Sequence, residues 1–111
     1  MCRVLKVLCA AADRDRLAEL KRAAVATHWE LVGGASSVQE LERQMAEFMP
    51  DVVVVDAGLG DQAVDSVRGA DRPARLVAVG RLARADAEAS EIGEVRSAIL
   101  GLPRPGGPVR T

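Results

Sequence analysis

Four consecutive valines, Val52 to Val55, form the segment that most limits what this chain can fold into. Pro50 and Asp51 precede the run, and Asp56 ends it. Successive side chains of a strand point to opposite faces of its sheet, so an unbroken β-branched run places apolar side chains on both faces. Strands that are buried on both faces belong to parallel sheets with helices on each side. The run therefore predicts a central strand of a parallel α/β sheet.

Strand-like and helix-like patterns alternate along the rest of the chain. The expected strands are residues 4–10, 30–33, 52–55, 76–79 and 98–102. The expected helices are residues 14–27, 37–48, 61–68 and 83–92. Repeated alternation of strand and helix is typical of right-handed βαβ units, so the expected fold is a doubly wound parallel sheet in one α/β domain.

Local sequence features support the first two helices. Asp13 is an N-cap residue for the first helix, and Ser37 and Glu40 have the spacing of a capping box at the start of the second. The apolar residues of the second helix recur at helical spacing, and they are Val38, Leu41, Met45 and Phe48. This stripe is expected to face the core.

The C-terminal part of the sequence is open to two interpretations. One is a helix over 83–92 followed by a strand over 98–102, and the other is a single long helix, which Gly93 disfavours. Only residues 106–111 follow Arg104 and Pro105, too few and too rich in Gly and Pro for a further helix. If the strand is correct, the final helix is missing. An apolar strip beside the first helix would then be bare, which predicts a homodimer or a docked partner.

Length and composition bound the class of protein. A chain of 111 residues suits one domain, placed at residues 1–105, with 106–111 as a flexible tail or the start of a linker. Hydrophobic residues make up 49% of the chain, more than a disordered protein has. The net charge of −1 and the aromatic content of 2% give no basis for binding nucleic acid. Without an apolar run near the ~20 residues of a membrane span, no membrane partner is expected.

The cysteines indicate a reducing compartment. Cys2 and Cys9 would lie about 23 Å apart on one strand at about 3.3 Å per residue, too far for a disulfide between them. Two reduced thiols and an N-terminus without a signal-peptide pattern predict a cytoplasmic location. Cys9 is expected to be a small buried apolar residue.

The stretch from Pro50 to Asp56, with the glycine-containing loop after it, resembles the third strand of response-regulator receiver domains. In that family the aspartate at the end of this strand accepts a phosphoryl group, so the resemblance places the phosphoacceptor position at Asp56. The resemblance covers residues 4–105. It implies a flavodoxin-like, receiver-like sheet with the strand order 2-1-3-4-5.

The other working positions of the family carry different residues in this chain. The acidic pair that holds Mg²⁺ falls on Ala10 to Ala12, the switching threonine or serine falls near Gly80, and the lysine before a proline falls on Arg104. Mg²⁺ prefers several oxygen ligands in octahedral geometry. Asp13 and Asp56 would make only a poor metal site, so we expect no cofactor, or Mg²⁺ held weakly by these two carboxylates.

Each candidate residue also has an ordinary structural interpretation. Asp56 is equally a turn residue after a buried strand, and Asp13 is more readily an N-cap than a metal ligand. His28 has no acidic or cysteine cluster around it in the sequence and is expected to be a solvent-facing loop residue, and Trp29 is expected to be a packing anchor. A solvated surface is the expected setting of Arg14, Arg16, Arg81 and Arg84.

The resemblance and its departures together imply a degenerate receiver, or pseudo-receiver, in bacterial two-component signalling and phosphorelay. Such a domain is not an enzyme, and it presents a surface to a protein partner or to a fused output domain. Two alternatives stay open. The domain could be phosphorylated inefficiently on Asp56, or it could be an N-terminal docking domain similar to the receiver-like modules fused to pilus-assembly ATPases.

Overall fold

Five parallel strands form one sheet in the order β2-β1-β3-β4-β5, which confirms the predicted topology. The structure is a computed structural model that describes residues 5–26, 29–69, 74–82 and 85–101. The strands are β1 (Leu5–Ala10), β2 (Trp29–Ala35), β3 (Val52–Asp56), β4 (Arg75–Val79) and β5 (Ala87–Ala89).

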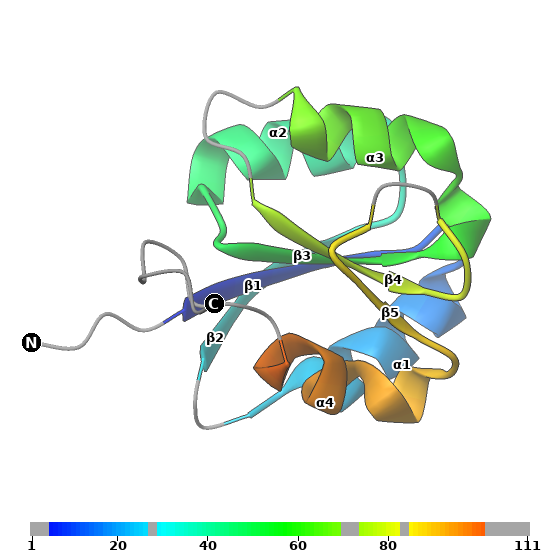
Figure 1. The fold of residues 1–111 in the computed structure, drawn as a ribbon. Coiled ribbons are helices and arrows are strands. Elements are labelled where there is room, and N and C mark those ends of the chain that lie inside the picture. Colours follow the sequence, from blue (N-terminus) through cyan, green and yellow to red (C-terminus); the bar gives the residue numbers. More distant parts are fainter. Residues whose placement is uncertain (1–4, 27–28, 70–73, 83–84, 102–111) are drawn as a thin grey trace, which may run out of the picture.

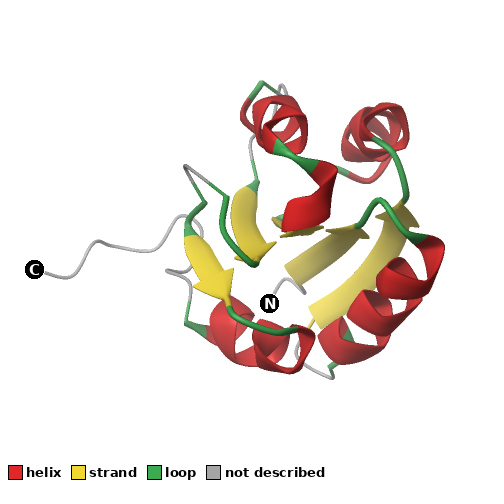
Figure 2. Cartoon of the chain, turned by 90° about the vertical axis from the view of Figure 1, so that its right-hand side faces the viewer, coloured by secondary structure: helices red, strands yellow, loops and turns green. Residues whose placement is uncertain are grey.

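Helices cover both faces of this sheet. They are α1 (Arg14–Ala24), α2 (Val38–Phe48), α3 (Asp61–Arg68) and α4 (Val95–Leu100), with short 3₁₀ turns η1 (Ala57–Leu59) and η2 (Ile92–Glu94). Figure 1 shows α2 and α3 on one side of the sheet and α1 and α4 on the other, and Figure 2 shows the same layers from a second direction. The arrangement is the doubly wound fold that the alternating pattern predicts.

The valine run lies at the centre of the sheet and contributes to both sides of the core. Val53 and Val55 belong to the apolar cluster under α2 and α3, whereas Val52 and Val54 belong to the cluster under α1 and α4. All four side chains are at most 2% exposed. The prediction of a strand buried on both faces is therefore confirmed.

The predicted helix caps are present. Asp13 is the N-cap of α1, and its Oδ1 accepts a hydrogen bond from the amide of Asp15 at 3.1 Å. Ser37 is the N-cap of α2, and its hydroxyl accepts from the amide of Glu40 at 3.1 Å. The Glu40 carboxylate reaches back to accept from the amide of Ser36 at 2.7 Å. These contacts satisfy amide groups that have no partner within the helix.

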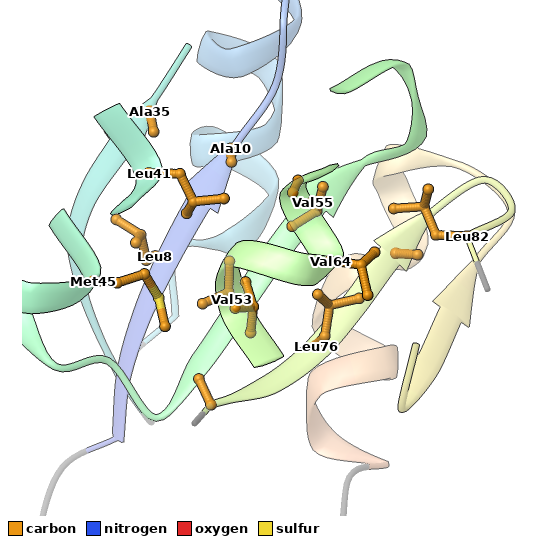
Figure 3. Packing of buried hydrophobic residues seen from close by; sticks show 14 residues of the cluster. Leu8, Ala10, Ala35, Leu41, Met45, Val53, Val55, Val64, Leu76 and Leu82 are labelled. Carbon is orange, nitrogen blue, oxygen red and sulfur yellow. The ribbon is translucent and has the colours of Figure 1, made fainter. Parts of the chain in front are cut away.

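The apolar stripe of α2 packs as the sequence predicts. Leu41 and Met45 are buried in the cluster that also contains Leu8 and Val53 (Figure 3). Phe48, at the end of the stripe, is only half-buried. Trp29 is buried on the other side of the sheet, where its indole N–H donates to the carbonyl of Ala24, which confirms its predicted role as a packing anchor.

Both predictions for the C-terminal part are wrong, as is the alternative of one long helix. The structure has strand β5 inside the predicted helix 83–92, and helix α4 where the strand 98–102 was expected to begin. In β5, buried Ala89 follows exposed Glu88, and this alternation prevails over the helix propensity of Ala and Glu. In α4, buried Val95 and Ile99 are spaced to lie on one helical face.

The expected absence of a final helix and the expected bare apolar strip are consequently also wrong. Helix α4 packs against α1, and Val95 and Ile99 share one apolar cluster with Leu20 and Ala24. Among the described residues, the exposed large apolar side chains are Val25, Met49 and Leu100. The expectation of a homodimer or of a partner docked on this face rests on the bare strip, and α4 removes that basis.

The connection between β4 and β5 is shorter than a normal crossover between parallel strands. It spans residues 80–86, whereas such crossovers take roughly a dozen or more residues and usually contain a helix. Leu82, in this connection, is buried at 7% exposure in the cluster under α2 and α3. Its side chain covers part of the sheet face that a crossover helix would cover.

The helices in the described part of the chain are too short or too polar to cross a bilayer.

Candidate functional site

The candidate site lies at the carboxyl edge of the sheet, where the chain leaves β1, β3 and β4. Ligands of open parallel sheets bind beyond this edge. Strand pairing brings the three exits together, because Ala10 of β1 lies opposite Val55 of β3, and Asp56 lies opposite Val79 of β4. Residues around Asp13, Asp56 and Gly80 are thus neighbours at one edge, as the resemblance implies.

Asp56 ends β3 with both carboxylate oxygens engaged by other groups of the chain. Its Oδ1 accepts a hydrogen bond from Nε of Arg16 at 3.1 Å, which makes an ion pair between α1 and β3. Its Oδ2 accepts from the amide of Gly58 at 3.4 Å, so Asp56 also caps η1. The Asp56 side chain is 14% exposed and the Arg16 side chain 43%. The structural interpretation of Asp56 as a turn residue is confirmed.

Arg16 is a site residue that the sequence pattern does not identify, since its position predicts only a solvated surface. The relevant signal is its place in the first turn of α1, three residues after the N-cap Asp13. The first turn of a helix that follows β1 stands beside the carboxyl edge of the adjacent strand β3. Arg14 and Arg81 are exposed, as expected, and Arg84 lies outside the described residues.

The residues at the family's acidic-pair position offer no carboxylate. Ala10 and Ala11 are fully buried, and Ala12 is exposed. Asp13, the nearest acid in sequence, is exposed and uses Oδ1 to cap α1. Within the described residues, no group of three or more His, Cys, Asp or Glu side chains is close enough to hold a metal ion.

This set of donors does not fit Mg²⁺. One carboxylate, Asp56, already faces a guanidinium, and the other, Asp13, is an exposed N-cap whose Oδ1 accepts from the amide of Asp15. Mg²⁺ retains several waters but needs at least one or two carboxylates free to bind it. A weak site formed by Asp13 and Asp56 stays a prediction, and the geometry at Asp56 argues against it.

The backbone requires a glycine at Gly80, the position that the resemblance matches to the family's switching hydroxyl. Its φ is +100°, a conformation that side chains with a Cβ rarely adopt, and a Cβ built there would lie 3.0 Å from the Cβ of Ala57. The Gly80 amide donates to the carbonyl of Ala89 at 2.8 Å, which fixes the start of the connection to β5. Arg104 and His28 lie outside the described residues.

Asp51, the other acid of the stretch that carries the resemblance, lies at the opposite end of β3. It is 7% exposed, and its Oδ2 accepts from the amide of Lys6 at 2.9 Å. Its own amide donates to the Lys6 carbonyl, and its carbonyl accepts from the Arg75 amide. Asp51 therefore connects three strands at the amino edge and is separate from the candidate site.

Two further groups have shifted pKa values. Burial raises the pKa of the Cys9 thiol to about 12, and the positive charge of Lys21 opposes this only in part. Hydrogen bonds from the amide and hydroxyl of Ser36 lower the pKa of the Glu40 carboxyl. Cys9 is consequently a neutral thiol and no nucleophile, and Glu40 is an ionised helix cap.

The sequence matches no protein-family model and no curated protein. Solved structures do match its fold. The signal receiver domain of the response regulator NarL from Mycobacterium tuberculosis has a TM-score of 0.70 at 19% identity, covering 89% of this chain and 95% of that one. The response regulator domain of Thermotoga maritima CheB has a TM-score of 0.59 at 22% identity, covering 86% and 74%.

A third similar structure belongs to a longer protein, the anti-anti-sigma factor PhyR from Bartonella quintana. Its TM-score is 0.65 at 13% identity, and the match covers 89% of this chain and 47% of that chain. At these identities the likeness concerns the fold. Together with the strand order, it shows that this chain has the flavodoxin-like, receiver-like fold seen in these response-regulator domains.

Proposed function

We propose that this chain is a degenerate receiver domain that acts in bacterial cytoplasmic signalling by binding a protein partner or an attached output domain, with little or no phosphorylation of Asp56. The observation that carries the proposal is the state of the Asp56 carboxylate. It bonds Arg16 and Gly58, and alanines stand where the family has its metal-binding acids.

Phosphorylation of a carboxylate requires an oxygen free to attack and a cation that neutralises the transferring group. Metal ions supply that neutralisation by bridging phosphoryl oxygens. At Asp56 the guanidinium of Arg16 holds the carboxylate itself, and the set of oxygen ligands for Mg²⁺ is incomplete. Both requirements are thus poorly met, which supports slow or absent phosphoryl transfer.

The switch position also lacks the means to respond. A receiver's hydroxyl at the end of the fourth strand is replaced by Gly80, which has no side chain to bond a phosphoryl group. The positive φ of Gly80 and the nearby Ala57 leave little room for a side chain there. These features support a domain that binds its partner through a surface that does not change with phosphorylation.

Binding rather than catalysis is supported by the chemistry of the described residues. Cys9 is fully buried and protonated, so it offers no thiolate. Two serine hydroxyls of the described residues donate to carboxylates. Ser36 bonds Glu40 as part of the cap of α2, and Ser66 bonds Glu42 in an exposed contact between α3 and α2, so both contacts have an ordinary structural role. We therefore propose no cofactor and no enzymatic activity for this domain.

Amide NMR spectra provide a test of this proposal. We expect the resonances of Gly58, Gly80 and Ala57 to stay in place when Mg²⁺ and a small phosphodonor are added together. Asp56→Asn serves as the matched control, since its spectrum should be equally insensitive to the addition. Shifts at these residues that are absent from Asp56→Asn would support the alternative of a phosphorylated receiver instead.

A further inference from the structure

The most distinctive feature of the site is a positive side chain in direct contact with Asp56. Arg16 Nε lies 3.1 Å from Asp56 Oδ1, and this contact joins α1 to the end of β3. The Asp56 side chain is only 14% exposed. A carboxylate so largely removed from water requires a compensating charge or several hydrogen bonds.

We propose that Arg16 permanently takes the place of a divalent cation at Asp56, so that the cation of this site is part of the protein chain. The inference deepens the proposed function, on which it rests, because it names the residue that keeps the site closed. It also assigns a role to Arg16 that is independent of any phosphoryl group.

The charges at the site agree with this assignment. One guanidinium neutralises one carboxylate, and Ala11 and Ala12 add no further negative charge. With an additional acidic pair, a single arginine would leave a net negative site that attracts a divalent cation. Conversely, a divalent cation close to Asp56 would be repelled by the guanidinium of Arg16. The absence of carboxylates at Ala11 and Ala12 and the presence of Arg16 thus act in the same direction, since both disfavour a divalent cation at Asp56.

The hydrogen-bond partners of Asp56 also support this role of Arg16. Arg16 reaches Asp56 through Nε, which leaves the carboxylate with one strong ionic partner and the amide of Gly58 as the second donor. Arg16 pairs with Asp56 and not with Asp13, whose Oδ1 accepts from the amide of Asp15. Arg14, two residues earlier in the same helix, is exposed and is a matched arginine without a contact to Asp56.

The test introduces a carboxylate at residue 12 and removes the positive charge of Arg16, in single variants and in one double variant. The variants are Ala12→Asp, Arg16→Met and the double variant, with Arg14→Met in the Ala12→Asp background as the control. Ala12 is exposed, so a carboxylate there is accommodated at the surface. Arg16→Met keeps an apolar stem of similar length, and Arg16→Lys provides a second, charge-preserving variant. Mn²⁺ binding is measured by titration calorimetry, and melting temperature with and without Mn²⁺ is measured in parallel.

We expect the double variant to bind Mn²⁺ at least about tenfold more tightly than Ala12→Asp alone. Ala12→Asp combined with Arg16→Lys, which keeps the positive charge, should show a smaller increase in Mn²⁺ affinity than the double variant. The melting temperature of the double variant should rise by several degrees at a Mn²⁺ concentration well above its Kd, because a ligand that binds only the folded state stabilises it. The Arg14→Met control should behave like Ala12→Asp alone.

Equal Mn²⁺ affinity of Ala12→Asp and the double variant would overturn the assignment of Arg16. So would tight Mn²⁺ binding by the unmodified protein. Neither result depends on phosphorylation, which is measured separately on Asp56. If the wild-type protein were phosphorylated and Mn²⁺ affinity still depended on Arg16, the proposed function would be contradicted and the role of Arg16 would be supported.

Discussion

Asp86 binds the main chain of Leu76 twice. Its amide donates to the Leu76 carbonyl at 2.8 Å, and its carboxylate Oδ2 accepts from the Leu76 amide at 2.7 Å. The same oxygen accepts from Nη2 of Arg68, the last residue of α3, at 3.2 Å. These contacts hold the end of the short connection against the start of β4, so β5 can follow without the usual crossover helix.

Replacing Asp86 with alanine should therefore destabilise the domain. The change removes a charge-assisted hydrogen bond and the ion pair with Arg68, and we expect a loss of about 1–3 kcal/mol in the free energy of unfolding. Urea denaturation measures the loss. Glu88→Ala is the matched control, because Glu88 is exposed on the adjacent strand β5 and should change stability little. Equal effects of the two substitutions would mean that Asp86 does not secure β5.

Introducing a hydroxyl side chain at Gly80 should lower the stability of the domain. Gly80→Ser places a Cβ at a φ of +100° and within 3.0 Å of the Ala57 Cβ, so we expect a loss of about 1–3 kcal/mol. Gly93→Ser is the control, since nothing lies within 4 Å of a Cβ at that position. Thermal denaturation compares the two variants, and a Gly80→Ser protein as stable as Gly93→Ser would refute the backbone argument.

The inner face of α2 should show a graded response to truncation. Met45→Ala removes a side chain that is 4% exposed and should cost about 2–5 kcal/mol. Phe48→Ala should cost less than a fully buried aromatic, because Phe48 is only half-buried. Glu47→Ala, on the exposed side of the same helix, should be nearly neutral. If Met45→Ala melted like the wild type, α2 would not pack as described.

Cys9 should resist alkylation while the domain is folded. Its pKa is raised to about 12, so the thiolate is scarce at pH 8 to 9, where an ordinary cysteine reacts readily. A folded-state pKa above the unfolded value stabilises the fold at pH below the unfolded pKa, and this contribution is lost as pH rises from about 9 toward 12. Peptide mapping after iodoacetamide treatment tests the reactivity, and rapid native labelling of Cys9 would contradict the buried position.

The central part of the fold could be predicted from the sequence because its patterns have one interpretation. The Val52–Val55 run, the Asp13 cap and the Ser37–Glu40 box each specify a local structure that the core then reinforces. In the C-terminal part the local signals conflict. Ala and Glu favour a helix around Ala87–Ala89, yet the bonds between Asp86 and Leu76 pair this segment with β4.

The site shows the same limit. The position of Asp56 follows from the strand pattern, since the end of a buried strand is readable from the sequence. Its partner is not readable in this way, because Arg16 lies forty residues earlier in the chain and meets Asp56 only through the pairing of β1 with β3. Likewise, the sequence places Gly80 at the switch position, but only the backbone shows that a glycine is required there.

Intact mass spectrometry of the protein incubated with acetyl phosphate and Mg²⁺ tests the central claim most directly. We expect the wild-type mass to stay unchanged, or a phosphoryl group to be added only slowly and in a minor fraction, because Arg16 holds the Asp56 carboxylate and the described residues offer an incomplete set of metal ligands. Asp56→Asn gives the background level of addition at other sites. Rapid and stoichiometric addition of one phosphoryl group to the wild type, lost in Asp56→Asn, would contradict the account.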